Sequence, residues 1–133
     1  MRTDLVTVIA GGLLLLEALG VAALTLVQLL AVIGGDTAEL ATAIALLVLT
    51  AIGAAAVAAF GVAALRDRSW GRSGGIVTQL LILAVAIGAA TGSYAHPLLG
   101  LQLSIPAVIT LVVLITAVRR AGLRRPADGD ADG

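Results

Sequence analysis

The stretch that decides the fold is Leu5–Ile33, LVTVIAGGLLLLEALGVAALTLVQLLAVI, an apolar run that contains one charged residue, Glu17. An α-helix needs about 20 apolar residues to cross the roughly 30 Å hydrocarbon core of a bilayer. The run exceeds that length and therefore predicts a membrane-spanning helix. Three further runs of the same kind follow, at Leu40–Leu65, Gly74–Ala95 and Pro97–Val118.

The composition of the whole chain agrees with four spans. Of its 133 residues, 60% are hydrophobic and 12% are charged, whereas a soluble domain is about 45–50% apolar and about 25% charged. Short connections force successive spans to run antiparallel. We therefore predict an all-α, polytopic membrane protein: an up-down four-helix transmembrane bundle over residues 1–121, followed by a disordered cytoplasmic tail over 122–133.

The residue types argue against several functions. The chain has eight basic residues, all arginine, and eight acidic residues, so no excess positive charge is available to bind nucleic acid. It has no Cys and one His, His96, which are too few ligands for a zinc, haem or iron–sulfur site. No Ser/His/Asp set, phosphate loop or carboxylate pair occurs at usable spacing. We expect no enzyme activity, no metal and no cofactor.

All eight arginines fall on one side of the predicted membrane. Arg2 precedes the first span, Arg66, Arg68 and Arg72 lie between the second and third spans, and four more follow the fourth span. Basic residues in short loops stay on the cytoplasmic side. We therefore expect a multi-pass protein of a bacterial inner membrane, with both termini in the cytoplasm.

Local signals mark several span ends. Gly34-Gly35 is typical of a helix C-terminus, because glycine adopts the left-handed cap conformation at little cost. Asp36 and Glu39 have the spacing of a capping box, which predicts that the second helix begins there. Pro97 suits the first turn of the fourth helix, where the N–H that it lacks is not needed.

Small residues recur at every fourth position on two of the predicted spans. Close helix packing in lipid uses such stripes, because they let two backbones approach each other. The stripes either pack the second and third spans within the chain or form an interface between copies of it. They comprise Ala51, Ala55, Ala59 and Ala63 on the second span and Ala84, Gly88 and Gly92 on the third.

Glu17 is the one ionisable side chain inside a span, and it lies about 18 Å along the helix from Leu5, near the membrane midplane. Gln28 lies on roughly the same helix face, and Thr50 and Thr110 are mid-span hydroxyls. No cation lies at comparable depth, so we expect Glu17 to be protonated and to donate a hydrogen bond to a hydroxyl or carbonyl. The site either fixes the helices or carries protons or cations.

The densest polar cluster is the segment 66–73, RDRSWGRS, between the second and third spans. Its arginines hold the loop in the cytoplasm, and its tryptophan anchors at the level of the lipid headgroups. The same residues are a candidate site for an anionic lipid or for the acidic face of a partner. This candidate site comprises Arg66, Arg68, Trp70 and Arg72, with Gln79 about one and a half turns into the third span and within reach of the loop. Gln79 could instead join two helices through a hydrogen bond.

Two resemblances follow from these residues. The segments Arg66–Arg72 and Val77–Leu81 resemble small four-span membrane proteins of high-GC actinobacteria, which implies the same fold and supplies no activity. Glu17 is similar to the membrane-embedded glutamate in the first span of the small multidrug resistance transporters. The chain departs from that family because Phe60 is its only mid-span aromatic and because its arginines all lie on one side.

These observations favour a non-enzymatic accessory or scaffold subunit of the inner membrane. Such a subunit would pack against a second copy or a larger membrane complex through the small-residue stripes, with the lipid bilayer around it. The alternative function is a small proton-coupled transporter that uses Glu17.

Overall fold

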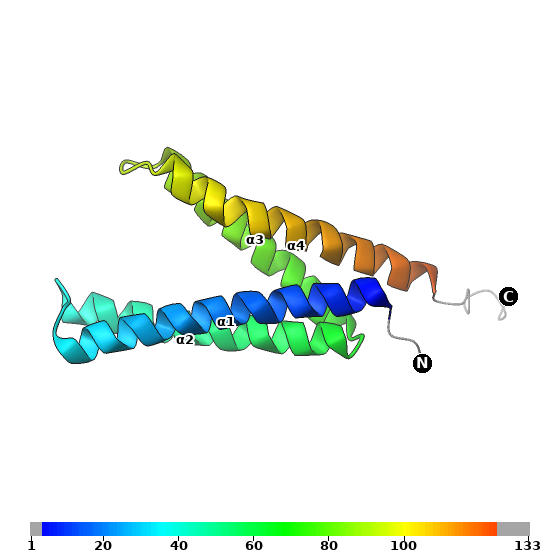
Figure 1. The fold of residues 1–133 in the computed structure, drawn as a ribbon, viewed down its shortest axis with the longest axis horizontal. Helices are drawn as coiled ribbons and strands as arrows, with labels where there is room; N and C mark the ends of the chain where they lie inside the picture. The colour runs from blue at the N-terminus through cyan, green and yellow to red at the C-terminus, as the bar shows by residue number, and fades with distance from the viewer. Residues whose placement is uncertain (1–3, 125–133) are drawn as a thin grey trace, which may run out of the picture.

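The computed structural model describes residues 4–124 as four helices joined by short loops (Figure 1). Each helix is long and apolar enough to cross a membrane. Most of the large apolar side chains are exposed, as lipid-facing positions require. The protein is therefore an all-α polytopic membrane protein with its helices in up-down order, as predicted. The helices are α1 (Leu5–Gly34), α2 (Leu40–Leu65), α3 (Ser69–Thr91) and α4 (Pro97–Leu123).

The helices form two hairpins, α1 with α2 and α3 with α4, which converge at one end of the molecule and diverge towards the other (Figure 1). We call the converging end the basic end, because it holds both ends of the described chain and the 66–68 connection. The opposite end carries the loops 35–39 and 92–96, and we call it the open end. The basic end holds Arg66, Arg68, Arg72, Arg119, Arg120 and Arg124.

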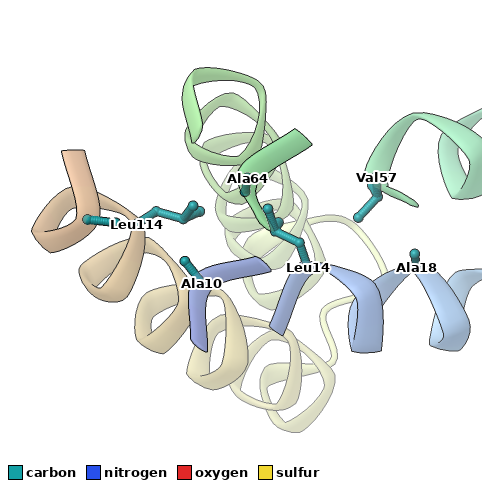
Figure 2. Close-up of a cluster of buried hydrophobic side chains, with 7 residues drawn as sticks. Ala10, Leu14, Ala18, Val57, Ala64 and Leu114 are labelled. Carbon is teal, nitrogen blue, oxygen red and sulfur yellow. The ribbon is translucent and has the colours of Figure 1, made fainter. Parts of the chain in front are cut away.

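The apolar core lies in the half of the bundle near the basic end. Leu14 and Leu114 are its largest members, and neither is exposed to solvent. The remaining members are small, so the helix backbones lie close together and van der Waals contact holds them in lipid. The cluster also contains Ala10, Ala18, Val57, Ala64 and Ala117 (Figure 2).

Two glycines of α3 leave room for neighbouring helices. A Cβ atom at Gly71 would lie 2.5 Å from the backbone nitrogen of Ala64, and one at Gly75 would lie 2.9 Å from Cδ1 of Leu14. α3 therefore contacts α2 and α1 at distances that no larger residue permits.

Two predicted helix ends are confirmed. α1 closes with Gly35 in the left-handed conformation, at φ 72°. The N–H of Gly35 donates to the carbonyl of Val32 at 3.3 Å, and the N–H of Asp36 donates to that of Ala31 at 3.0 Å, which is a Schellman motif. α4 has Pro97 in its first turn.

The predicted capping box is wrong. α2 begins at Leu40, its N-cap residue is Glu39, and no side chain caps it. The Glu39 carboxylate instead accepts a hydrogen bond from the Thr42 hydroxyl. The reason is the preceding helix: the N–H of Asp36 is bonded to Ala31 of α1, so Asp36 belongs to the end of α1.

α3 begins at Ser69 rather than at Gly74, so much of the expected loop is helical. α2 ends in a second Schellman motif, in which Asp67 has φ 58° and the N–H of Arg68 donates to the carbonyl of Ala63 at 2.9 Å. This closure reverses the chain within three residues. α4 continues to Leu123, past the expected start of the tail at 122, and residues 125–133 lie outside the described part of the chain.

The small-residue stripes do not face the packed interior, which corrects the prediction that they hold α2 and α3 within the chain. Only Ala63 is buried; Ala51, Ala55, Ala59, Ala84, Gly88 and Gly92 are exposed. A helix has about 3.6 residues per turn, so a repeat of four drifts by about 40° per step and faces one neighbouring helix for only a few turns. On α2, less exposed positions follow alternating steps of four and three at Ala43, Leu47, Thr50, Ala54, Val57, Gly61 and Ala64.

Glycine substitutions separate the close contacts from the exposed stripe. Gly71→Ala and Gly100→Ala should each lower the free energy of unfolding by about 1–3 kcal/mol, because the added carbon meets backbone that cannot move aside. At Gly100 that carbon would lie 2.7 Å from the carbonyl oxygen of Ala86. Gly88→Ala is the matched control, since its Cβ meets nothing within 4 Å. The free energy of unfolding of the three variants is measured in detergent. A loss of stability for Gly88→Ala equal to that for Gly71→Ala would contradict the close contacts described for Gly71.

Candidate functional site

Glu17 of α1 connects the two hairpins through hydrogen bonds to α3 and α4. Nε2 of Gln79 donates to Oε2 of Glu17 at 2.6 Å, and Oγ1 of Thr110 donates to Oε1 of Glu17 at 2.9 Å. Gln79 is 0% exposed and Thr110 is 1% exposed, while Glu17 is half-buried. We call these three residues the polar clamp.

The core positions the polar clamp. Glu17, Gln79 and Thr110 each lie three or four residues from a side chain or glycine of the close-packed region, so each shares a helix face with it. Those neighbours are Leu14, Gly75 and Leu114, which also contact one another across the three helices. The hydrogen-bond distances in the clamp are therefore set by apolar packing one turn away.

Glu17 accepts hydrogen bonds in this structure, which differs from the donor role predicted for it. A hydroxyl partner was expected, and Thr110 supplies it, but as the donor. Oε1 of Gln79 is buried and has no partner within residues 4–124. Rotating the Gln79 amide by half a turn would present this acceptor to a protonated Glu17. The clamp thus has donors for a carboxylate and an acceptor for a neutral carboxyl.

The other two residues proposed for this site lie elsewhere. Oγ1 of Thr50 donates to the carbonyl of Leu46 in its own helix at 2.6 Å. Gln28 lies about 16 Å further along α1 than Glu17, towards the open end. Its Oε1 is buried without a hydrogen-bond partner in the described chain. Neither residue joins the polar clamp.

The residues of the candidate lipid site that the sequence predicts lie in different surroundings in the structure. Nη1 of Arg72 lies 2.6 Å from Oδ1 of Asp67, and Arg72 is only 6% exposed, so its charge is neutralised inside the protein. Gln79 belongs to the polar clamp, because α3 begins at Ser69 and Gln79 is almost three turns into the helix. Of the residues predicted for the candidate lipid site, Arg66, Arg68 and Trp70 remain exposed.

Sequence reasoning missed the ion pairs at the basic end. Oδ2 of Asp4 accepts a hydrogen bond from Nη2 of Arg124 at 2.7 Å, and Oδ1 of Asp4 lies 3.5 Å from Nη1 of Arg120. These pairs join the start of α1 to the end of α4. Asp4 and Asp67 each lie close in the sequence to a basic terminus or loop. That proximity is the signal from which these ion pairs could have been predicted.

Compared with known protein families, with curated proteins and with solved structures, the chain gives no match. The polar clamp, the exposed small-residue stripes and the exposed arginines of the basic end are the features that bear on its function.

Substitutions at two threonines test whether the polar clamp holds the hairpins together. Thr110→Val should lower the free energy of unfolding by about 0.6–2 kcal/mol, the range for an interhelical hydrogen bond in a membrane. Thr50→Val is the matched control and should cost less, because Thr50 bonds only its own helix. Unfolding in detergent micelles is the measurement. Equal losses for the two variants would show that the bond to Glu17 does not stabilise the fold.

Proposed function

We propose that the protein is a non-enzymatic accessory or scaffold subunit of a bacterial inner membrane. In this proposal it packs against a second copy or a larger membrane complex through exposed small-residue faces. The observation that carries the proposal is the exposure of Ala84 and Gly88 on α3, and of Gly92 just after its end, towards the open end. A side chain at Gly88 would meet no atom within 4 Å, so the glycine is not needed for packing within the chain.

Small residues elsewhere in the chain support this interpretation. Gly71 and Gly100 each accept the backbone of a neighbouring helix, so close approach over small residues is how these helices associate. The α3 stripe offers a second surface of the same kind, and the divergence of the hairpins leaves it uncovered (Figure 1). A helix from outside the chain could approach this surface as closely.

The proposal also gives the protein one orientation in the membrane. The basic end lies in the cytoplasm, because it holds the arginines, and both termini lie there with it. Anionic lipid headgroups contact this end.

The polar clamp has a structural role, since its donors are buried and come from both helices of the second hairpin.

Disulfide cross-linking tests the stripe in native membranes, because the chain has no cysteine of its own. If two copies pack through the stripe, Gly88→Cys should give a cross-linked dimer under mild oxidation. Ile87→Cys is the control: Ile87 is 64% exposed at the same depth, and its side chain points about 100° away around the helix.

If the partner is a different protein, a photo-reactive residue at position 88 should give one discrete adduct and the same residue at position 87 should not. Gly88→Leu should then abolish the assembly while leaving the unfolding of the monomer unchanged. Equal adducts at 87 and 88, or none at either position in a folded protein, would overturn the scaffold proposal.

A second candidate function is proton-coupled transport, and one observation favours it. Glu17 is a carboxyl residue at membrane depth, and it is only half-buried although both of its donors are buried. Intramembrane carboxylates often mark proton pathways.

Vesicles with a pH-sensitive dye inside distinguish transport from a structural role. For a scaffold subunit we expect no substrate-dependent proton flux and normal stability of Glu17→Gln, because a rotated Gln79 amide can accept from the new amide. A flux with wild-type protein that disappears in a stably folded Glu17→Gln variant would establish transport instead. Glu17→Ala is the control for loss of the clamp, and it should unfold more readily than Glu17→Gln.

A further inference from the structure

A groove of about 530 Å³ runs along the last turns of α2 at the basic end. One part of its lining is apolar and consists mostly of alanine, and the other part is cationic. Its apolar floor consists of Ala58, Ala59, Val62 and Ala63, and its far end of Arg66, Arg68 and Trp70. The distance along the helix from Ala58 to Arg66 is about 12 Å. The groove therefore changes from apolar to cationic along its length.

The two arginines of the groove are not neutralised within the described chain. Arg72 pairs with Asp67, and Arg120 and Arg124 pair with Asp4. Between residues 4 and 124, Arg66 and Arg68 have no such acidic partner, and both are exposed. Two uncompensated guanidinium groups at one end of an apolar groove attract an anion, because arginine forms paired hydrogen bonds with phosphate oxygens.

Trp70 lines the groove beside the arginines and packs against Phe60. The rings of Trp70 and Phe60 meet edge to face, with centroids 6.0 Å apart and planes at 71°. The Phe60 ring occupies the space that a side chain at Gly74 would need, so α3 holds it in place. Trp70 remains 53% exposed. Tryptophan in such a position lies at the level of the lipid headgroups, which places the arginines at the same level.

We propose that this groove binds one anionic phospholipid, with its phosphate on Arg66 and Arg68 and an acyl chain along Ala58–Ala63. The order of apolar floor, aromatic wall and cationic end matches an amphiphile that lies along a membrane helix. A soluble anion would leave the apolar floor without an occupant. An acidic peptide would have to enter the depth of the bilayer to reach that floor.

This inference deepens the proposed contact of the basic end with anionic lipid, and it rests on that contact. It adds which arginines bind and which do not. Arg72 is excluded by its ion pair with Asp67, and Arg120 and Arg124 are excluded by their ion pairs with Asp4.

Native mass spectrometry of the purified full chain tests the site, with phosphatidylglycerol and phosphatidylcholine of identical acyl chains as probes. We expect wild-type protein to retain one phosphatidylglycerol in preference to phosphatidylcholine. Arg66→Gln with Arg68→Gln should weaken the retention by about tenfold or more, because each basic residue near an anionic lipid surface adds to binding. The matched control, Arg119→Gln with Arg120→Gln, removes the same charge from the same end and should retain the lipid.

A second pair of variants tests the acyl-chain part. Ala59→Leu should weaken binding by filling the groove, while Ala51→Leu, two turns away on the same exposed stripe, should not. Neither position is buried, so both variants should fold.

The outcomes separate this site from the broader lipid contact. If both double arginine variants weaken binding equally, the basic end binds anionic lipid without this groove, and the inference is wrong. If wild-type protein shows no preference for phosphatidylglycerol, the proposed lipid contact itself is wrong. Displacement of the bound lipid by inorganic phosphate or by an acidic peptide would assign the arginines to a soluble ligand or a protein partner and overturn the inference.

Discussion

The rest of the structure depends on how closely α3 approaches its neighbours at the basic end. In lipid, helices are held by direct contact rather than by the exclusion of water, so small residues decide where they meet. Gly71 makes room for the backbone of α2, Gly74 for the Phe60 ring, and Gly75 for Leu14 and Leu114. About one turn of α3 is thereby packed against all three other helices. That position brings Gln79 to Glu17 further along the helix, and Trp70 to Phe60 at its start.

The sequence predicts the features that local chemistry determines. Four apolar runs predict four helices, and the bounds of α2 agree because charged segments flank it on both sides. The end of α1 at Gly35 and the start of α4 at Pro97 follow from backbone preferences that act without any neighbour. The sequence predicts that Glu17 donates to a hydroxyl or carbonyl, and Thr110, one of the two mid-span hydroxyls, is its partner, although Thr110 is the donor.

The features that the sequence did not predict depend on which face of a helix meets which neighbour. Repeats of four drew attention to Ala55 and Gly88, but buried repeats of four, such as Gly71, Gly75 and Gln79, extend over only about two turns in this chain, and the contact face of α2 follows alternating steps of three and four. The early start of α3 depends on Asp67 adopting a left-handed conformation, and its ion pair with Arg72 lies beside that turn. Because α3 begins at Ser69, Gln79 lies almost three turns into the helix rather than one and a half, and at that depth it pairs with Glu17. A single error in one boundary therefore misplaced a residue of the site.

The polar clamp explains why the hairpins can diverge and still remain one bundle. Among the described residues, none of α1 after Ala18 and none of α2 before Val57 is fully buried, so packing between the hairpins stops near Glu17. Separating α1 from α3 and α4 at this depth would leave Glu17, Gln79 and Thr110 without partners in hydrocarbon, where an unpaired polar group costs several kcal/mol. Separating the apolar side chains nearer the basic end carries no such penalty, since lipid is as apolar as leucine and can take the place of their contacts. The clamp therefore marks the depth to which the hairpins must stay together, and beyond it the surfaces of α1 and α3 are available to lipid or to another helix.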